Sequence, residues 1–347
     1  MFLFNNIYIS YNRTYMKKVF ITGASGFIGS HLTERMVKEG FKVKALVPYN
    51  IESSWGWLDN VDKKIKKDIE IVAGDVCDQD LINKSLKDVN IIYHLAALIS
   101  IPYSYISPRS YVSTNIVGTL NILEAMKINN VELMVNTSTS EVYGTSQYSP
   151  IDEKHPLNAQ SPYAATKIAA DQICLSYFRS FGLPVTVIRP FNTFGPRQSL
   201  RAAIPTMITQ AINNPKNFKI GNLKSKRDFS YVDDTVNGYV ECLNNKKCLG
   251  EVINLGTGFD ISMEEVLEII KKNLKIEIKV QIDKSRLRPK KSEVDHLLSD
   301  NRKAHKLLNW RPKNVGKKGF EQGIVKTINW FKEEKNLKLY KSDLYNV

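Results

Sequence analysis

The sequence lacks the features that would place a chain in a membrane or outside the cell. Its longest apolar runs, such as residues 90–101, are shorter and more interrupted than the about 20 apolar residues of a membrane-spanning helix. Only 4 cysteines occur in 347 residues, none with CxxC spacing, which argues against a disulfide framework and a zinc site. The first residues show neither the charged region nor the cleavage site of a signal peptide. We predict a cytoplasmic protein that binds no membrane and no metal, with residues 1–15 as an N-terminal extension.

An excess of acidic residues is also absent, since the formal net charge is +14. The hydrophobic fraction of 43% and the charged fraction of 24% are typical of a globular chain with a packed core. The lysines are scattered as pairs, such as Lys63-Lys64, and form no basic stripe with aromatic residues between them. This pattern favours a basic surface that attracts anionic small molecules over one that binds nucleic acid.

Apolar runs typical of strands alternate with helical patterns in the first half of the chain. The runs cover residues 17–22, 41–47, 69–73, 90–94, 132–138 and 184–189. They are continuous rather than alternating, as expected for strands that are covered on both faces. Helical periodicity follows within residues 28–40 and 111–127. The pattern predicts an α/β fold with a Rossmann-like, doubly wound parallel sheet.

The regular alternation ends after residue 190, where loops rich in proline, asparagine and lysine begin. Clear helices are predicted beyond that point only at 263–274 and 322–335. We therefore predict a NAD(P)-binding domain over residues 16–190 with a returning segment near 229–260. A smaller C-terminal α/β substrate domain is predicted over residues 191–228 and 261–347.

A glycine-rich turn, Gly23-Ala-Ser-Gly-Phe-Ile-Gly29, follows the first predicted strand and opens a helix. Glycines there permit a tight turn and close approach of a pyrophosphate, which then faces the helix N-terminus. The predicted cofactor contacts are Gly23, Ser25, Gly26, Phe27, Ile28 and Gly29 from this turn, and Asp75 and Val76 after the third strand. Asp75 is also suited to cap a helix. The second strand ends in Val-Pro-Tyr-Asn, with neither the acid typical of NAD binding nor an arginine for NADP, so NAD is favoured and NADP is not excluded.

Tyr163 and Lys167 follow Ser161 and Pro162 and stand four residues apart on one face of a predicted helix. An ammonium beside a phenol stabilises the phenolate, which would let Tyr163 take a hydroxyl proton near neutral pH. Thr139, Ser140 and Glu141 come at the carboxyl end of the fifth predicted strand, where open α/β sheets bind ligands. A carboxylate at 141 indicates a second proton transfer, or else a helix cap.

The glycine turn, Thr139, Tyr163 and Lys167 together resemble the extended short-chain dehydrogenase/reductase family, whose Ser/Thr-Tyr-Lys triad they match in order and spacing. The resemblance covers nearly the whole chain after residue 16. It implies catalytic roles for the residues at 139–141 and for Tyr163 and Lys167. It also implies cofactor contacts by Leu95, Ala96, Ala97 and Asn115.

Residues 227–234 and 288–300 look like segments of GDP-mannose 4,6-dehydratases. By this resemblance Arg227 and Arg288 hold a diphosphate, for which planar guanidinium groups are suited, and Glu293 accepts from the nucleoside ribose. Asn192 and Arg201 are further implied substrate contacts. Residues 54–59, 96–105 and 286–289 resemble more closely the bacterial GDP-N-acetylglucosamine 4,6-dehydratases of legionaminic acid synthesis.

The resemblance implies that a GDP-hexose is oxidised at C4, loses water across C5 and C6, and regains its hydride at C6. A UDP-glucuronate decarboxylase and a nucleotide-sugar C4 epimerase share the oxidation step and are alternatives. A non-catalytic cofactor sensor or RNA-binding protein is an alternative of another class, disfavoured by the intact set of catalytic side chains. The family commonly dimerises through helices corresponding to 111–128 and 162–181, so a homodimer or a dimer of dimers is expected.

Overall fold

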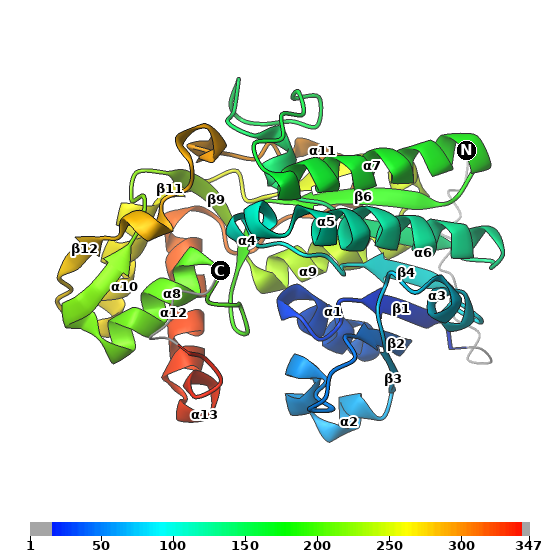
Figure 1. Cartoon of the computed structure of the whole chain (residues 1–347), viewed down its shortest axis with the longest axis horizontal. Coiled ribbons are helices and arrows are strands. Elements are labelled where there is room, and N and C mark those ends of the chain that lie inside the picture. Colours follow the sequence, from blue (N-terminus) through cyan, green and yellow to red (C-terminus); the bar gives the residue numbers. More distant parts are fainter. Residues whose placement is uncertain (1–15, 342–347) are drawn as a thin grey trace, which may run out of the picture.

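The computed structural model describes residues 16–341, so the predicted extension at 1–15 lies outside the described residues. Its larger part is a seven-stranded parallel sheet in the order β10-β6-β5-β4-β1-β2-β3, covered by helices on both faces (Figure 1). The strands are β1 (Lys18–Thr22), β2 (Lys42–Val47), β3 (Ile69–Ala73), β4 (Ile91–His94), β5 (Leu133–Thr137), β6 (Val185–Pro190) and β10 (Val252–Leu255). The predicted Rossmann-like α/β fold is confirmed.

The six predicted strands each lie within one residue of their observed ends. Their side chains are almost all buried in β1, β4, β5 and β6, as continuous apolar runs require in a sheet covered on both sides. The seventh strand, β10, comes from the segment at 229–260 and pairs with β6, with Val252 opposite Val187. This segment therefore returns to the edge of the sheet.

Helices on the two faces of the sheet enclose two separate apolar cores. One face carries α1 (Phe27–Lys38) and α9 (Val232–Glu241), and the other carries α3 (Gln79–Ser85), α6 (Gly118–Lys127) and α7 (Pro162–Phe181). Short helices α2 (Lys63–Lys66), α4 (Ile101–Ile106) and α5 (Pro108–Tyr111) fill the connections, and a π-helical stretch, Val112–Val117, joins α5 to α6. Within residues 16–341, none of the helices combines the length and the apolar character that crossing a bilayer would take.

The remaining elements form a smaller part beside the carboxyl edge of the large sheet (Figure 1). A four-stranded sheet has β9 at its centre, and β8 pairs with β12 in a separate ribbon. The strands are β7 (Asn192–Phe194), β8 (Phe218–Ile220), β9 (Lys226–Tyr231), β11 (Asp260–Ser262), β12 (Val280–Ile282) and β13 (His296–Leu297). The helices of this part are α8 (Ala203–Asn213), α10 (Met263–Leu274), α12 (Gly316–Lys332) and α13 (Glu334–Leu337), whereas α11 (Arg302–Leu308) packs against β10 and α9 of the larger part.

The predicted helix at 263–274 matches α10, which begins with a capping box between Ser262 and Glu265. The helix predicted at 322–335 is wrong at both ends, because α12 runs from Gly316 to Lys332. Gly316 and Gly319 weaken the helical pattern of the sequence at the start of α12. Gly319 is needed there, because a Cβ would lie 2.5 Å from the carbonyl carbon of Asn314.

The strand register brings polar side chains to one edge of the large sheet. Thr22 at the end of β1 is opposite His94, which is in turn opposite Asn136 of β5. Strands β1 and β4 are neighbours, but the next strand after β1 is β2 on one side of the pair, and the next strand after β4 is β5 on the other side. Ligands of open α/β sheets bind at such a switch point, beyond the carboxyl ends of the strands.

Candidate active site

The glycine-rich turn lies between β1 and α1, at this carboxyl edge. Gly23 has φ +67, and a Cβ there would lie 2.9 Å from the backbone nitrogen of Ala96. A Cβ on Gly29 would lie 2.1 Å from the carbonyl oxygen of Gly23. Gly26 has only a 3.3 Å approach to the same carbonyl, and it leads into the unpaired N–H groups that begin α1. The turn, which also contains Ser25, Phe27 and Ile28, fits the pyrophosphate of a dinucleotide.

The other predicted cofactor residues follow β3 and β4. Asp75 is exposed, and its Oδ1 accepts from the backbone of Cys77 at 2.9 Å, whereas Val76 is buried. The backbone nitrogens of Leu95 and Ala96 donate to Thr22 Oγ1 at 3.1 and 3.0 Å, which fixes the segment 95–97 beside the glycine turn.

Asn115 is buried in the π-helical stretch, where its amide serves the protein itself. Its Oδ1 accepts from Leu98 N at 2.8 Å. Its Nδ2 donates to Leu98 O and to Thr166 Oγ1, both at 3.0 Å. Asn115 therefore ties the loop after β4 to α7.

Thr139, Ser140 and Glu141 follow β5 and begin the 3-10 turn Ser140–Tyr143. Thr139 Oγ1 accepts from the backbone of Glu141 at 3.2 Å and is also hydrogen-bonded to the Tyr163 hydroxyl. The Glu141 carboxylate is close enough to Tyr163 to act on its phenol electrostatically. Ser140 is buried. The structure thus brings together the turn after β5 and the predicted tyrosine of α7.

Tyr163 and Lys167 lie on the buried side of α7, which starts as predicted with Ser161 as its cap and Pro162 at its first position. Burial raises the pKa of Tyr163, and the negative charge of Glu141 adds to this, while the hydrogen bond with Thr139 opposes it. Burial also lowers the pKa of Lys167, against the effect of Asp171. The expectation that Lys167 sets the Tyr163 pKa below its usual value is therefore wrong for the chain without ligand, because burial of the phenol prevails.

A buried polar network lies behind this pair and was not predicted from the sequence. Asp171 Oδ2 accepts from Ser138 Oγ at 2.7 Å and from Arg189 Nε at 3.0 Å. Arg189 Nη1 donates to the Tyr143 hydroxyl at 3.0 Å, and that hydroxyl donates to Asn254 Oδ1 at 2.7 Å. The network joins β5, α7, β6 and β10 directly below the site.

Two predicted substrate arginines each lie close to a carboxylate. Arg288 Nη1 lies 3.7 Å from Glu141 Oε1, and Arg227 Nη2 lies 3.6 Å from Glu293 Oε1. Arg227 is buried and donates to three backbone carbonyls, those of Lys226, Val294 and Asp295. Arg227 therefore supports the chain at 293–295, a use that the sequence did not indicate.

The two remaining predicted substrate residues flank the same site. Asn192 begins β7, and its buried Oδ1 has no hydrogen-bond partner within the described residues, as expected of an acceptor that awaits a donor. Arg201 is exposed, and its charge acts on the Tyr111 phenol. Tyr111 contacts Tyr163 edge to face, with ring centroids 6.3 Å apart.

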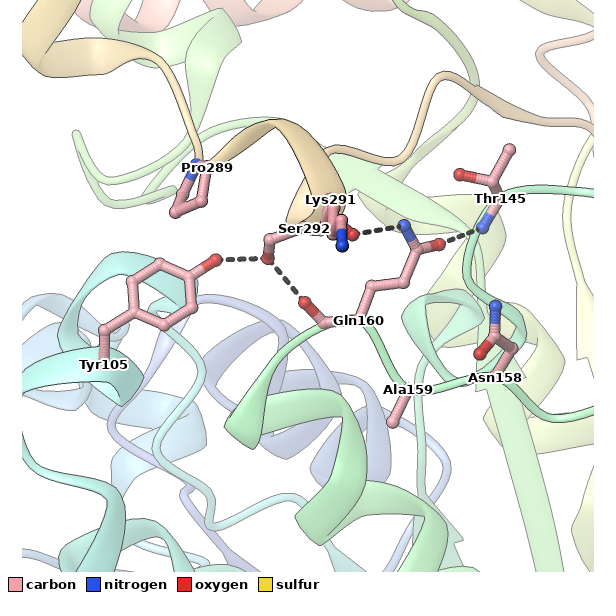
Figure 2. Close-up of a pocket in the computed structure, with 8 residues that line it drawn as sticks. All are labelled: Tyr105, Thr145, Asn158, Ala159, Gln160, Pro289, Lys291 and Ser292. Atoms are coloured by element: carbon pink, nitrogen blue, oxygen red, sulfur yellow. Dashed lines mark hydrogen bonds between the residues drawn. The ribbon is translucent and has the colours of Figure 1, made fainter.

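A pocket of about 580 Å³ lies between the segment 289–292 and residues 158–160 (Figure 2). Ser292 Oγ bonds with the Tyr105 hydroxyl and donates to Gln160 O at 2.5 Å. Gln160 Nε2 donates to Lys291 O at 2.9 Å, and its Oε1 accepts from Thr145 N. These contacts fasten the segment that carries Arg288 to α4 and to the chain ahead of Tyr163.

Comparison with known proteins finds relatives along nearly the whole chain. Residues 20–327 match the model of the GDP-mannose 4,6 dehydratase family. A putative UDP-glucose 4-epimerase of Methanocaldococcus jannaschii is 31% identical over 319 residues, which are 90% of this chain and 98% of that protein. UDP-glucuronic acid decarboxylase 1 of Xenopus tropicalis is 30% identical over 335 residues, covering 92% of this chain and 73% of that protein.

A solved structure is similar along nearly the whole chain. The dTDP-glucose 4,6-dehydratase of Bacillus anthracis in complex with NAD superposes with a TM-score of 0.79 at 30% identity, covering 94% of this chain and 99% of that one. An epimerase, a decarboxylase and a dehydratase are thus about equally similar to this sequence, so overall identity does not distinguish the three reactions.

Proposed function

Because the chain belongs to the extended short-chain dehydrogenase/reductase family of NAD-dependent epimerases and dehydratases, we propose that it is a nucleotide-sugar 4,6-dehydratase that uses NAD. The observation that carries the proposal is the position of Glu141. Its backbone nitrogen donates to Thr139 Oγ1 at 3.2 Å, and its carboxylate acts electrostatically on the Tyr163 phenol, so a second base stands near the group that would deprotonate the sugar's 4-hydroxyl. Elimination of water across C5 and C6 requires such a base, whereas inversion at C4 does not.

The glycine turn and the segment 95–97 would hold NAD, with residues 16–190 and 229–260 as its domain. Bound NAD would supply a reversible acceptor for the C4 hydride, which returns to C6 after water has left. The similar dehydratase structure from Bacillus anthracis contains NAD, which supports NAD over NADP as the cofactor. Residues 191–228 and 261–347 would form the domain for the sugar nucleotide.

Each catalytic side chain would then have one task. Tyr163 takes the proton from the 4-hydroxyl, with Thr139 hydrogen-bonded to its oxygen. The Lys167 ammonium, buried one turn away, stabilises the phenolate that accepts this proton. Glu141 removes the C5 proton, which the new C4 carbonyl has made acidic.

We propose a GDP-sugar as the substrate, with GDP-N-acetylglucosamine the first to be tested. The match to the GDP-mannose 4,6 dehydratase model over residues 20–327 supports the guanine nucleotide. The acetamido sugar rests on the resemblance of residues 54–59, 96–105 and 286–289 described above. Asn192, Arg201, Arg288 and Glu293 would contact the substrate.

A UDP-glucuronate decarboxylase is the second candidate, because a decarboxylase is among the relatives and would share the oxidation at C4. Incubation of the enzyme and NAD with GDP-N-acetylglucosamine, GDP-mannose, UDP-N-acetylglucosamine and UDP-glucuronate tests both. Mass spectrometry distinguishes loss of water, loss of carbon dioxide and an unchanged mass. An unchanged mass together with inversion at C4 would instead establish an epimerase.

The Glu141→Gln variant tests the role that carries the proposal. The rate of dehydration should fall by about 10²- to 10⁴-fold, the usual contribution of a general base. Slow reduction of bound NAD should still be visible as a rise in absorbance at 340 nm. Ser140→Ala is the matched control, since Ser140 has no acid–base task in this scheme and most turnover should remain. Full dehydration by Glu141→Gln would refute the assignment.

We also propose that the enzyme works as a homodimer or a dimer of dimers. Apolar side chains stand exposed along α5, α6 and α7 and their ends, with exposed fractions of 47% for Val112, 40% for Val117 and 54% for Phe181. Light scattering after size-exclusion chromatography gives the mass directly, and a monomer would contradict this part of the proposal.

A further inference from the structure

Four charged side chains around Glu141 form a group whose formal charges cancel. Arg288 lies beside Glu141, and Arg227 lies beside Glu293. The pairs are not independent: burial is the main cause that lowers the pKa of Arg227, and the charges of Glu141 and Arg288 act on this pKa as well. Each arginine is already close to a carboxylate. An anionic ligand that enters this group must therefore compete with a carboxylate for a guanidinium.

The two arginines are not equally free to change partners. Backbone carbonyls hold the guanidinium of Arg227. Its Nη1 donates to Lys226 O at 2.9 Å and to Asp295 O at 3.1 Å. Arg288 instead has a buried Nη1 without a hydrogen-bond partner among the described residues. Its 3.7 Å separation from Glu141 exceeds the about 2.7–2.9 Å of a charge-assisted hydrogen bond. Arg288 therefore keeps donor capacity for a better acceptor.

The backbone that carries Arg288 is fastened while its side chain remains partly exposed. Ser292 bonds with Tyr105 and with Gln160 O, and Gln160 holds Lys291 O (Figure 2). The Arg288 side chain is 27% exposed, against 7% for Arg227. A change of partner at Arg288 can thus occur by side-chain rotation, with the segment 289–292 in place.

We infer that Arg288 is shared: it pairs with Glu141 in the chain without substrate, and the diphosphate of the nucleotide takes it over, which frees Glu141 to act as the base. The inference rests on the proposed function and deepens it. A diphosphate offers several anionic oxygens in the geometry that a guanidinium prefers, so it is a stronger partner than a carboxylate at 3.7 Å. A carboxylate that has lost its counter-ion takes up a proton more readily. Binding of the nucleotide end would thereby prepare the chemistry at the sugar end.

The inference makes an unusual prediction for binding: removal of a catalytic carboxylate should tighten the nucleotide. Titration calorimetry of the NAD-loaded full chain with GDP, UDP and dTDP measures the affinity. Glu141→Gln should bind the preferred diphosphate at least 5-fold more tightly than the unaltered chain, the lower end of typical coupling between sites. Arg288→Gln should bind it more weakly. In the double variant the gain from Glu141→Gln should vanish, because Arg288 is no longer present for the two anions to share.

Glu251→Gln is the control for a general effect of net charge. Glu251 pairs with Lys303 at 2.7 Å just before β10, at the opposite end of the parallel sheet from the site. It should leave the affinity within about 2-fold, since a distant, solvent-screened charge contributes little. Unfolding midpoints of all variants verify that each is folded.

The outcomes separate the inference from the proposed function. If no nucleoside diphosphate binds the unaltered chain, the nucleotide-sugar function fails and the inference with it. If one binds but Glu141→Gln leaves its affinity unchanged or lower, or tightens it equally without Arg288, only the sharing of Arg288 is overturned.

Discussion

Asp171 and Arg189 form an ion pair inside the protein, with Arg189 Nη2 3.0 Å from Asp171 Oδ2 and exposed fractions of 0% and 3% for the two side chains. Asp171 lies one helical turn beyond Lys167 on α7, and Arg189 lies on the neighbouring strand β6. The pair therefore fixes to the sheet the face of α7 that carries Tyr163 and Lys167. A buried pair of this kind is costly to break, because its remaining member keeps a charge without a partner.

Asp171→Asn should accordingly destabilise the fold by about 3–5 kcal/mol, because the guanidinium of Arg189 stays buried and loses its counter-ion. Urea unfolding measures the change. Glu334→Gln is the matched control, since it breaks an ion pair with Lys338 whose side chains are 79% and 72% exposed. Exposed pairs contribute about 0–1 kcal/mol, so equal effects of the two variants would show that the buried pair has no special role.

Tyr105→Phe tests the attachment of the segment that carries Arg288. Loss of the hydroxyl that bonds with Ser292 should raise KM for the nucleotide sugar by about 2- to 10-fold, the value of one hydrogen bond, with a smaller effect on kcat. Trypsin provides a second measurement without substrate, because Lys290 and Lys291 lie in this segment and should be cleaved faster in the variant. The control is Tyr103→Phe, on the same helix and equally exposed at 38%, whose ring contacts Tyr111 instead. Identical behaviour of the two variants would contradict the role of Tyr105.

Replacement by alanine should have different effects at two glycines of the glycine-rich turn. Gly26→Ala leaves a 3.3 Å approach to Gly23 O at an ordinary φ of −78°, so the chain should fold normally and lose affinity for NAD. Gly29→Ala would place its Cβ 2.1 Å from the same oxygen and should reduce both stability and NAD binding. Thermal unfolding with and without NAD separates the effects. A Gly26→Ala protein that binds NAD like the unaltered chain would show that the pyrophosphate lies elsewhere.

Local patterns in the sequence predicted the parts of the site that depend on neighbours along the chain. The glycine turn, the capped start of α7 and the four-residue spacing of Tyr163 and Lys167 are properties of short segments. Long continuous apolar runs also predicted the first six strands along the chain, β1 to β6, because both faces of the sheet are covered.

Relationships between distant segments could not be predicted in this way. Glu141 and Arg288 meet only because the 288–293 segment folds back over the turn after β5. Arg227 resembled a diphosphate ligand in the sequence, yet its donors are used mainly by backbone carbonyls that only the fold brings near. Burial of Tyr163 likewise depends on the packed whole, so the spacing to Lys167 gave the wrong sign for its pKa.

The pH dependence of stability should reveal the burial of His31 in α1. Burial, and then the charge of Arg197, lower the pKa of His31 from 6.5 to about 4, while its bond with Pro196 O opposes the change. An unfolded chain thus binds a proton below pH 6.5 that the folded chain takes up only near pH 4. Stability from this group is complete above pH 6.5 and is lost as the pH falls toward 4, by about 2 kcal/mol at pH 5.

His31→Gln should remove that part of the slope. Urea unfolding at pH 7.5 and pH 5 should show the variant less stable at pH 7.5, where the ring's packing is lost, with the difference reduced by about 2 kcal/mol at pH 5. Asp228 acts in the opposite sense, because burial raises its pKa to about 6 and folding then favours its protonated form as the pH falls. The comparison of variant with unaltered chain cancels Asp228 and isolates the histidine. Parallel pH profiles for the two proteins would mean that His31 is protonated as readily in the folded chain as in the unfolded one.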